Sequence, residues 1–419
     1  MTKNLLKISL VVSAILTLVI FLIVIIYEKE SSENIIINLS KRIVAEGTAP
    51  VARFLIKDKE VNGFYFGPEV NSDAGPDKRL IIGYAKESFK GEGIKIINTK
   101  SYKIYESAKH FQYENFTNSE LRLLREKYHL DKLVSGADRE LDKIILLMGW
   151  LRKIIPSGDP ERLNYNFSAL DILSRAQEGD TFSCSGYSIA FVQSALSLGF
   201  TARYVGLFKG HIVAEIWSNE FAKWIVMDVY NDLHYEKDGI PLNALELHEI
   251  WEKRDFSGLN VLSGIERKDF VENTKEGLLS YYHEFYVRMR NDWFSHKYPH
   301  WHPKANSIMN ALEWQDRFTR NNILVAKETT NKDDLYFPLN ITAINTAGYD
   351  DTLGKLNIVF DTFTPNFEYF LLDIDGKEFN HNKGFFLWGL LKGKNHLKVC
   401  SVNSMGIKGP TSYVELERL

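Results

Sequence analysis

One cysteine in the sequence occupies a position that favours nucleophilic chemistry. Cys184 lies in the stretch TFSCSGYSIAF, at the expected start of a helix that runs to Leu198 and is ended by Gly199. Thr181 and Ser183 are good helix N-caps, so the thiol falls in the first turn, where unpaired backbone N–H groups and the helix dipole favour negative charge. The thiolate is the nucleophilic form of cysteine, and the same N–H groups can hold an oxyanion. Taken alone, however, this residue is better explained as a buried, inert thiol.

A base and a carboxylate follow in the next apolar segments. If HIVAEIW and AKWIVMD pair as a hairpin with a loop at Ser218–Phe221, His211 stands directly opposite Asp228 on one face of the sheet. The carboxylate then fixes the imidazole tautomer and stabilises the imidazolium, while the other ring nitrogen faces the sulfur. This register favours a catalytic triad with Cys184 over the inert interpretation.

Hydrophobic periodicity predicts the elements that must position these residues. Apolar residues recur at helical spacing in 119–134, 138–155 and 168–179. After Gly199 the pattern changes to three strands, TARYVGLF, HIVAEIW and KWIVMDVY, rich in β-branched and aromatic residues. Helices followed by an antiparallel sheet indicate an α+β core.

These segments resemble the core of the transglutaminase-like superfamily over roughly 138–231. The resemblance rests on a cysteine at a helix start, a GFTAR turn into a strand, a Gly-His with a Glu four residues on, and a Trp-x-x-x-Asp strand, in family order and spacing. It implies a papain-like fold in which Cys184 is the nucleophile, His211 the base and Asp228 the third member. It also implies a thioester formed from an amide carbonyl and resolved by water or an amine, with hydrolysis favoured over cross-linking.

The resemblance leaves the second oxyanion donor open. Trp150 and Tyr187 are the candidates for that role. Phe182 stands where many members of the superfamily have a glycine, two residues before the cysteine. Glu215 is expected to be a structural partner within the core, and Arg203 is expected to serve the turn and an internal ion pair.

A histidine-rich segment, HKYPHWHPK, follows the core. His296, His300 and His302 fall close together, but no Asp, Glu or Cys at a recognisable ligand spacing completes a metal site. We therefore predict no metal and no other cofactor. His300 and Trp301 are candidates for the rim of the substrate site, with a plain packed connector as the alternative.

The end of the chain is predicted to be strand and turn. From about 335 onward, apolar segments about ten residues apart, with Gly and Asn turns, indicate a sandwich of roughly seven strands. The stretch FLWGLLKGKNHLKVCSVNSMGIKGP resembles the closing strands of fibronectin-III or other immunoglobulin-like modules, which implies a spacer or a binding module. Cys400 lies in one of these strands without a basic partner and is expected to be structural.

The N-terminus differs in composition from the rest of the chain. Ile8–Tyr27 carries no charge, and about 20 apolar residues match the ~30 Å hydrocarbon core of a bilayer. The run is too long for the core of a signal peptide and lacks a small-x-small cleavage site, which favours an uncleaved signal anchor over a cleaved leader. Lys3 and Lys7 before it, and EKESSEN after it, favour an N-terminus inside and an extracytoplasmic body, periplasmic or at the cell surface.

Composition bounds the remaining possibilities. The 419 residues are 45% hydrophobic and 25% charged, as in a globular protein of two or three packed units. A net charge of −3 with both signs interspersed gives no basic field for nucleic acid, so nucleic acid is not expected as a partner. Two distant cysteines do not indicate a disulfide framework.

Together these patterns predict a membrane-anchored thiol amidase, protease or transglutaminase-type acyltransferase that acts on a protein or peptide, such as one of the cell envelope. The alternative is a catalytically silent binding protein of the envelope or of a polysaccharide, in which the core is a scaffold. The predicted regions are a cytoplasmic tip and transmembrane anchor at 1–33, a strand-rich region at 34–116, the thiol core at 117–268, a helical extension at 269–330 and an immunoglobulin-like sandwich at 331–419.

Overall fold

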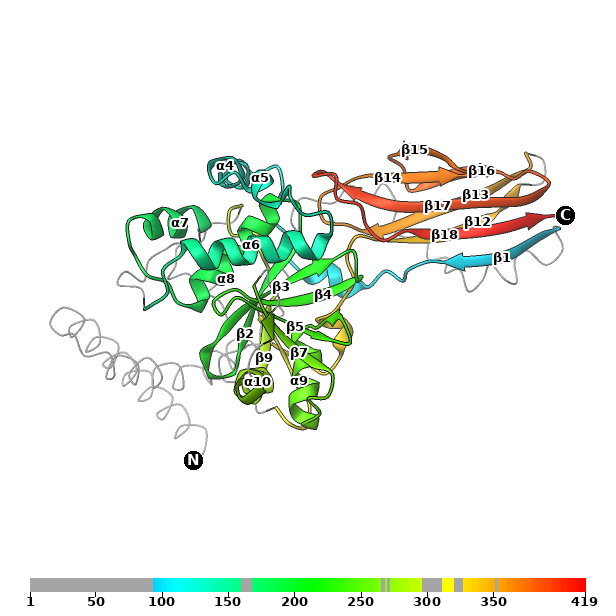
Figure 1. The fold of residues 1–419 in the computed structure, drawn as a ribbon. Helices are drawn as coiled ribbons and strands as arrows, with labels where there is room; N and C mark the ends of the chain where they lie inside the picture. The colour runs from blue at the N-terminus through cyan, green and yellow to red at the C-terminus, as the bar shows by residue number, and fades with distance from the viewer. Residues whose placement is uncertain are drawn as a thin grey trace, which may run out of the picture.

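The computed structural model describes residues 93–159, 168–264, 268–269, 272–295, 311–319, 327–350 and 353–419. The predicted membrane anchor, most of the predicted strand-rich region, and the rim candidates His300 and Trp301 lie outside these ranges. Within them, no helix is long and apolar enough to cross a membrane. Figure 1 shows a body of helices and sheet, from which an elongated all-strand body extends.

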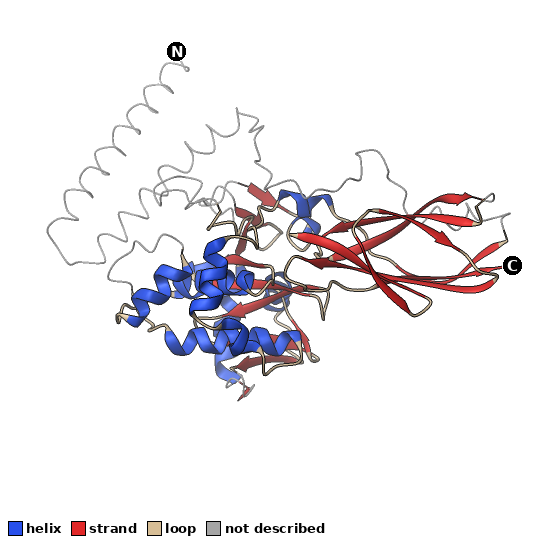
Figure 2. Cartoon of the chain, turned by 90° about the horizontal axis from the view of Figure 1, so that it is seen from above, coloured by secondary structure: helices blue, strands red, loops and turns tan. Residues whose placement is uncertain are grey.

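The helices of the first body lie on both faces of its sheet (Figures 1 and 2). One face is covered by α4 (Ser119–Lys127), α5 (Leu130–Val134), α6 (Glu140–Ile154), α7 (Ala169–Gln177) and α8 (Cys184–Ser197). The other face is covered by α9 (Ala244–Lys253) and α10 (Glu272–Leu279). Side-chain N-caps mark the start of several of these helices. α9 begins at a capping box, in which Asn243 and Glu246 each accept a hydrogen bond from the backbone N–H of the other.

The sheet of this body is ten-stranded, with the order β11-β10-β9-β2-β3-β4-β5-β7-β8 and with β6 paired to β5. Its strands are β2 (Ala202–Leu207), β3 (Ile212–Ser218), β4 (Lys223–Asp228), β5 (Leu233–Lys237), β6 (Ile240–Pro241), β7 (Leu259–Ser263), β8 (Lys268–Asp269), β9 (Phe285–Arg288), β10 (Ala311–Trp314) and β11 (Lys327–Thr329). Neighbouring strands are antiparallel except β10 and β11, which are parallel. The predicted class, helices followed by an antiparallel sheet, is confirmed.

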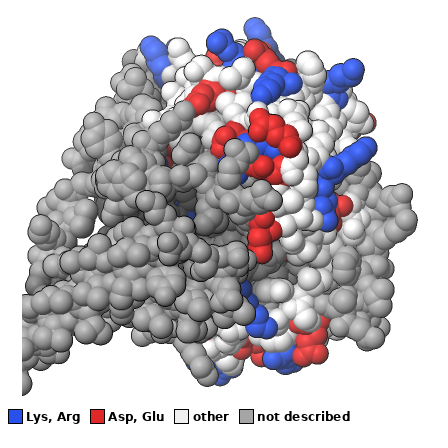
Figure 3. Space-filling view, turned by 90° about the vertical axis from the view of Figure 1, so that its left-hand side faces the viewer, with Lys and Arg blue, Asp and Glu red and all other residues white. Residues whose placement is uncertain are grey.

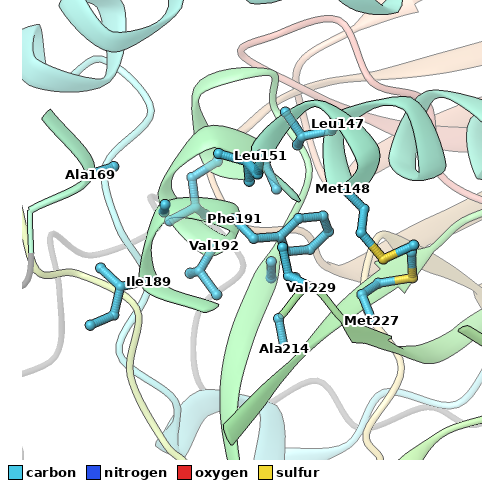
Figure 4. Packing of buried hydrophobic residues seen from close by; sticks show 14 of the residues in the cluster. Leu147, Met148, Leu151, Ala169, Ile189, Phe191, Val192, Ala214, Met227 and Val229 are labelled. Carbon is cyan, nitrogen blue, oxygen red and sulfur yellow. The ribbon is translucent and has the colours of Figure 1, made fainter. Parts of the chain in front are cut away.

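Helix α8 is the central helix of the core. All its residues from Gly186 to Ser197 are buried. In Figure 4, Phe191 of α8, Met148 of α6 and Met227 of the sheet belong to one cluster of buried side chains. A helix that is buried on every side lies in the interior of its protein. The element that carries Cys184 is therefore held by packing all around.

The hairpin of β3 and β4 differs from its predicted register by two residues. Ser218 pairs with Lys223, so the loop occupies 219–222 instead of 218–221. The cause is a cross-strand aromatic pair: Trp217 stands directly opposite Trp224, with ring centroids 5.9 Å apart. The sequence pattern alone did not reveal this pairing.

The register error leaves the predicted faces intact. Extending the observed pairing sets Asp228 across from position 213, so the prediction that His211 lies directly opposite was wrong. Side chains alternate between faces with a period of two, so an even shift keeps His211 and Asp228 on the same face. They meet diagonally instead of directly across the ladder.

The predicted helical extension is mostly strand where it is described. Only α10 and the 3-10 turn η4 (Ser280–His283) are helical, whereas β9 and β10 join the core sheet. β9 pairs with β2 through Val205, Gly206 and Leu207. The prediction was wrong for these strands because every residue of β2 is buried, and a buried strand needs hydrogen-bonding partners on both edges.

The second body consists of a five-stranded and a three-stranded sheet. The five-stranded sheet has the order β1 (Ile94–Lys100), β18 (Ser412–Arg418), β17 (Gly393–Asn403), β14 (Phe367–Ile374) and β15 (Lys377–His381). The three-stranded sheet has the order β12 (Ile341–Asp350), β13 (Lys355–Phe363) and β16 (Phe385–Gly389). Apolar side chains of both sheets, such as Trp388 and Leu397, share one core. The strand-rich C-terminal region is confirmed, and its immunoglobulin-like identity stays a prediction.

The domain boundaries differ from the prediction at β1. This strand falls in the predicted N-terminal region, yet it pairs along β18 at the other end of the chain, from Ile94 opposite Arg418 to Lys100 opposite Tyr413. The pattern of a strand indicates its faces but not its partner, so its place at the edge of the C-terminal sheet was not predictable.

The two bodies meet at the C-terminal end of α8. The carbonyl of Gly199 accepts a hydrogen bond from Asn403 Nδ2 at 3.1 Å, and Met405 packs on the helical core. Gly199 has φ of +85°, and a side chain there would collide with Met405. Glycine is therefore required both to end the helix and to let the two bodies approach.

Candidate active site

The candidate nucleophile is the first residue of α8. Ser183 precedes it with extended backbone (φ −81°, ψ 178°), and its side chain makes no cap hydrogen bond. The hydroxyl of Thr181 donates to the carbonyl of Asp159 at 2.7 Å instead. Without a side-chain cap, the first N–H groups and the helix dipole are free to favour negative charge on the sulfur. Cys184 is partly exposed, and its Sγ lies 3.9 Å from the carbonyl oxygen of Gly210.

Phe182 anchors the loop in front of the thiol. Its side chain is fully buried, and the guanidinium of Arg175 lies 5.3 Å from its ring centroid. Its N–H donates to the carbonyl of Pro156 at 2.9 Å, and its carbonyl accepts from the N–H of Gly158 at 3.2 Å. Phe182 thus ties this loop to the chain that follows α6.

The predicted base and carboxylate are hydrogen-bonded to each other. His211 Nε2 and Asp228 Oδ2 are 2.9 Å apart, with 12% of the histidine side chain and 2% of the aspartate side chain exposed. His211 directly precedes β3 and Asp228 ends β4, so both stand at the strand ends beside the start of α8. With Nε2 bound to Asp228, Nδ1 is the nitrogen left for the sulfur of Cys184.

The charge of His211 follows from opposing effects. Burial by itself would lower the pKa of this imidazole. The hydrogen bond to Asp228, the proximity of Cys184 and the charges of both groups outweigh burial and raise the pKa of His211 to about 10. An imidazolium at neutral pH is the partner that stabilises a thiolate. The arrangement therefore places an imidazole that is protonated at neutral pH beside the thiol.

The sequence analysis missed Asn231, which orients the carboxylate. Its Nδ2 donates to Asp228 Oδ2 at 2.8 Å, and its backbone N–H donates to Asp228 Oδ1 at 3.3 Å. Both oxygens of this buried carboxylate therefore have donors. The signal was present in the stretch DVYND, because aspartate commonly accepts hydrogen bonds from residues two or three positions later in a turn.

Two tyrosines that the sequence analysis did not single out flank the imidazole. The ring centroids of Tyr281 and Tyr230 lie 5.0 and 6.5 Å from that of His211. Tyr230 follows β4 closely in sequence, whereas Tyr281 arrives from η4. These rings keep part of the water away from the imidazole, which strengthens its interactions with the charged groups beside it.

The hydroxyl of Tyr187 is not available to an oxyanion. It donates to the carbonyl of Ile155 and accepts a hydrogen bond from Arg152 Nη1 at 3.3 Å. A phenol has one proton to donate, and here that proton is bound to Ile155. The assignment of Tyr187 as an oxyanion donor was therefore wrong.

Trp150 lies on the side of α6 that faces α4. Its ring packs edge-on against Tyr128, which follows α4, with centroids 6.0 Å apart. The same part of α4 contacts the far end of α8, where Arg125 donates to the carbonyl of Ser197. Trp150 stays a prediction as an oxyanion donor, without a contact that supports it.

The remaining predicted site residues are outside the triad. His300 and Trp301 fall in the undescribed segment before β10. Among the described residues, no group of three His, Cys, Asp or Glu side chains could hold a metal ion. Cys400 is a free, buried thiol in β17, and burial raises its pKa, as expected of a structural cysteine.

A second charged pair lies deeper in the same sheet. Arg203 and Glu215 are direct cross-strand partners, fully buried, with Nη2 and Oε2 2.6 Å apart. The other oxygen of Glu215 accepts from the N–H of Ala244 at 2.8 Å and from the hydroxyl of Tyr336 at 3.1 Å. The guanidinium lies 3.9 Å from the ring centroid of Trp224. The predicted structural roles of both residues are confirmed.

The face of the molecule on the α7 side mixes both signs of charge. In the described part of this face, Lys and Arg side chains lie next to Asp and Glu side chains, with uncharged atoms between them (Figure 3). A ligand approaching there meets short-range pairs of opposite charge and no broad field of one sign.

Comparison with known proteins identifies one part of the chain. Residues 128–229 match the model of the transglutaminase-like superfamily. This range includes α6, α8, β3 and β4. It also includes all three residues of the predicted triad, Cys184, His211 and Asp228. No curated protein and no solved structure matches the chain.

Proposed function

We propose that the transglutaminase-like superfamily domain at residues 128–229 makes this chain a cysteine-dependent acyltransferase or hydrolase that acts on an amide bond. The observation that carries the proposal is the His211 imidazole, which is hydrogen-bonded to Asp228 at 2.9 Å and whose pKa is raised to about 10 by Asp228 and the neighbouring Cys184. Among the described residues, Cys400 has no such imidazole beside it, and burial raises the pKa of its thiol.

Acylation is the first half of the proposed reaction. The thiolate of Cys184 attacks the carbonyl carbon, so a C–S bond forms while one electron pair of the C=O bond moves onto oxygen. The oxyanion then collapses and the C–N bond breaks. The imidazolium of His211 gives its proton to the departing nitrogen, which leaves a thioester and a neutral imidazole. Asp228 keeps its negative charge and holds the ring in place.

Release of the acyl group restores the starting state. The neutral imidazole of His211 takes a proton from water or from an amine as that molecule attacks the thioester. The C–S bond breaks, and Cys184 leaves as a thiolate beside the imidazolium. Water yields a carboxylic acid, and an amine yields a new amide. We favour water as the acceptor, hence an amidase or a protease.

The proposed setting follows from the sequence. The uncharged run Ile8–Tyr27 would anchor the chain in a membrane, with its catalytic body outside the cytoplasm. A protein or peptide of the cell envelope would then be the substrate.

Alkylation by iodoacetamide tests whether the thiol is activated. At about pH 6 an ordinary thiol of pKa ~8.5 is less than ~1% ionised, so we expect Cys184 to react on the order of tenfold or more faster than such a thiol. His211→Ala should abolish this advantage. Peptide mapping by mass spectrometry separates Cys184 from Cys400, which serves as the internal control. If Cys184 reacts like an ordinary thiol and His211→Ala changes nothing, the proposal fails, and a non-catalytic scaffold becomes the better interpretation.

A further inference from the structure

The backbone N–H groups at the start of α8, that of Cys184 first among them, are the oxyanion donors that the described triad takes from the sequence analysis. Acyl transfer through a tetrahedral intermediate is usually assisted by more than one donor aimed at the developing charge. The hydroxyl of Tyr187 is bound to Ile155, and Trp150 packs toward α4. A further oxyanion donor must therefore come from the sheet beneath α8 or from the substrate itself.

Contacts along α8 show which part of the sheet lies beneath the thiol. One helical turn after Cys184, Ser188 Oγ donates to the carbonyl of Ile212 at 3.2 Å. Ile212 begins β3 and is the direct cross-strand partner of Gly206 in β2. Because the sulfur also lies 3.9 Å from the carbonyl oxygen of Gly210, it stands beside this end of the Gly206–Ile212 pair.

Tyr286 reaches the Gly206–Ile212 pair from the strand on the other side of β2. It lies in β9 and is the direct partner of Gly206. A Cβ atom on Gly206 would be 2.1 Å from Cζ and 2.4 Å from the hydroxyl oxygen of Tyr286. The end of the phenol therefore lies directly over Gly206, in space that only a glycine leaves open. The hydroxyl is thus carried across β2 toward β3 and the thiol.

The hydroxyl of Tyr286 is free to donate. Among the described residues it has no hydrogen-bond partner, whereas that of Tyr204, on the same face of β2, lies 3.1 Å from Ser185 Oγ. Burial raises the pKa of Tyr286, the charge of Arg288 lowers it, and the charge of Cys184 raises it further. The net rise keeps the phenol protonated at neutral pH, so its hydroxyl has a proton to donate.

We propose that Tyr286 is a catalytic residue of the acyl transfer described above, on which this inference rests: its hydroxyl donates a hydrogen bond to the oxyanion that forms when Cys184 attacks a carbonyl. The backbone N–H of Cys184 is the second donor. The carbonyl oxygen of the substrate then lies over β2, between the start of α8 and the phenol, and the leaving nitrogen lies on the side of His211.

The test compares two reactions of one thiol. Iodoacetamide reacts by displacement at a saturated carbon and forms no oxyanion, whereas p-nitrophenyl acetate acylates the thiol through a tetrahedral oxyanion. Tyr286→Phe is expected to slow acylation of Cys184 by on the order of 10²-fold, measured as the burst of p-nitrophenolate and as the acetylated peptide. Its alkylation rate should stay unchanged. Tyr204→Phe, the matched loss of a neighbouring hydroxyl, should leave both rates unchanged.

A second variant moves the hydroxyl without removing it. Gly206→Ala places a methyl group where the phenol now lies, so acylation should fall as in Tyr286→Phe while alkylation persists. Thermal unfolding of each variant checks that the fold is retained.

Three outcomes would contradict the proposals, each in a different way. Unchanged acylation in Tyr286→Phe overturns the role of Tyr286. Equal losses of acylation and alkylation in that variant also overturn it, because they indicate an effect on the thiolate or on the fold. If the unaltered protein shows no acylation that depends on Cys184, the proposed function itself fails.

Discussion

Two charged pairs of the core sheet share β3 but differ in their position along it. Arg203 and Glu215 lie within β2 and β3, fully buried, and the carboxylate is completed by hydrogen bonds from Ala244 and Tyr336. His211 and Asp228 lie at the strand ends, where the imidazole is partly exposed and stands between a carboxylate and a thiol. Burial alone does not distinguish a structural pair from a chemical one.

The difference between the pairs lies in which cation can release a proton. A guanidinium keeps its proton at any pH that the fold tolerates, so Arg203 can only hold neighbouring elements together. An imidazole can both gain and lose a proton in the pH range in which proteins are folded, so His211 can transfer a proton. The strand ends are also where the start of α8 meets the sheet, and there the third group, Cys184, becomes available.

The comparison predicts its largest effect for Asp228→Asn. This change keeps the shape of the side chain but removes the charge that stabilises the imidazolium, so we expect kcat/KM with p-nitrophenyl acetate to fall about 10⁴-fold. The free energy of unfolding should fall by on the order of 1.5–3 kcal/mol, because the imidazolium loses its buried partner. A loss smaller than about tenfold would contradict a catalytic role for the pair.

Glu215→Gln is the matched change in the structural pair. It leaves the guanidinium of Arg203 buried without a counter-charge, so the free energy of unfolding should fall by about 3–5 kcal/mol, measured by urea denaturation. The activity of the protein that remains folded should be close to that of the unaltered chain. A stable but inactive Glu215→Gln protein would erase the distinction between the two pairs.

The two pairs should also differ in their dependence on pH. The pKa of His211 is raised from 6.5 to about 10, so its interactions stabilise the fold fully below about pH 6.5 and this stabilisation is lost as the pH rises toward about 10. The difference in unfolding free energy between the unaltered protein and His211→Ala should therefore be largest near pH 6, on the order of 1.5–3 kcal/mol, and shrink as the pH approaches 10. The effect of Glu215→Gln should stay constant over that range. A constant effect of His211→Ala would contradict the raised pKa.

Asn231→Ala should have the smallest effect. It removes the side-chain hydrogen bond to Asp228 without removing the carboxylate, which predicts a fall in kcat/KM of about tenfold, or about 1.4 kcal/mol. Asn219→Ala is the control, because Asn219 lies in the loop at the opposite end of the same hairpin and accepts a hydrogen bond from Trp217. Equal losses in the two variants would indicate a general effect on the hairpin.

Much of the candidate site was predictable because its signals are local. The cysteine at a helix start, the helices before it and the strands after it all follow from short-range periodicity and capping residues. The pairing of His211 with Asp228 survived a wrong register because face depends only on whether the separation is odd or even. The partners of β1 and β9 were not predictable, because a strand pattern does not say which distant strand it will join.

The sequence by itself therefore determined the three groups of the proposed triad and the face on which two of them lie. Only the tertiary structure decided which tyrosine hydroxyl is available for the proposed oxyanion site: packing binds the hydroxyl of Tyr187 to Ile155, while the pairing of β9 with β2 brings Tyr286 over Gly206. The physical reason is that backbone geometry sets the direction of a side chain within its own element. Which hydroxyl lies near the start of α8 depends instead on which distant elements pack against each other.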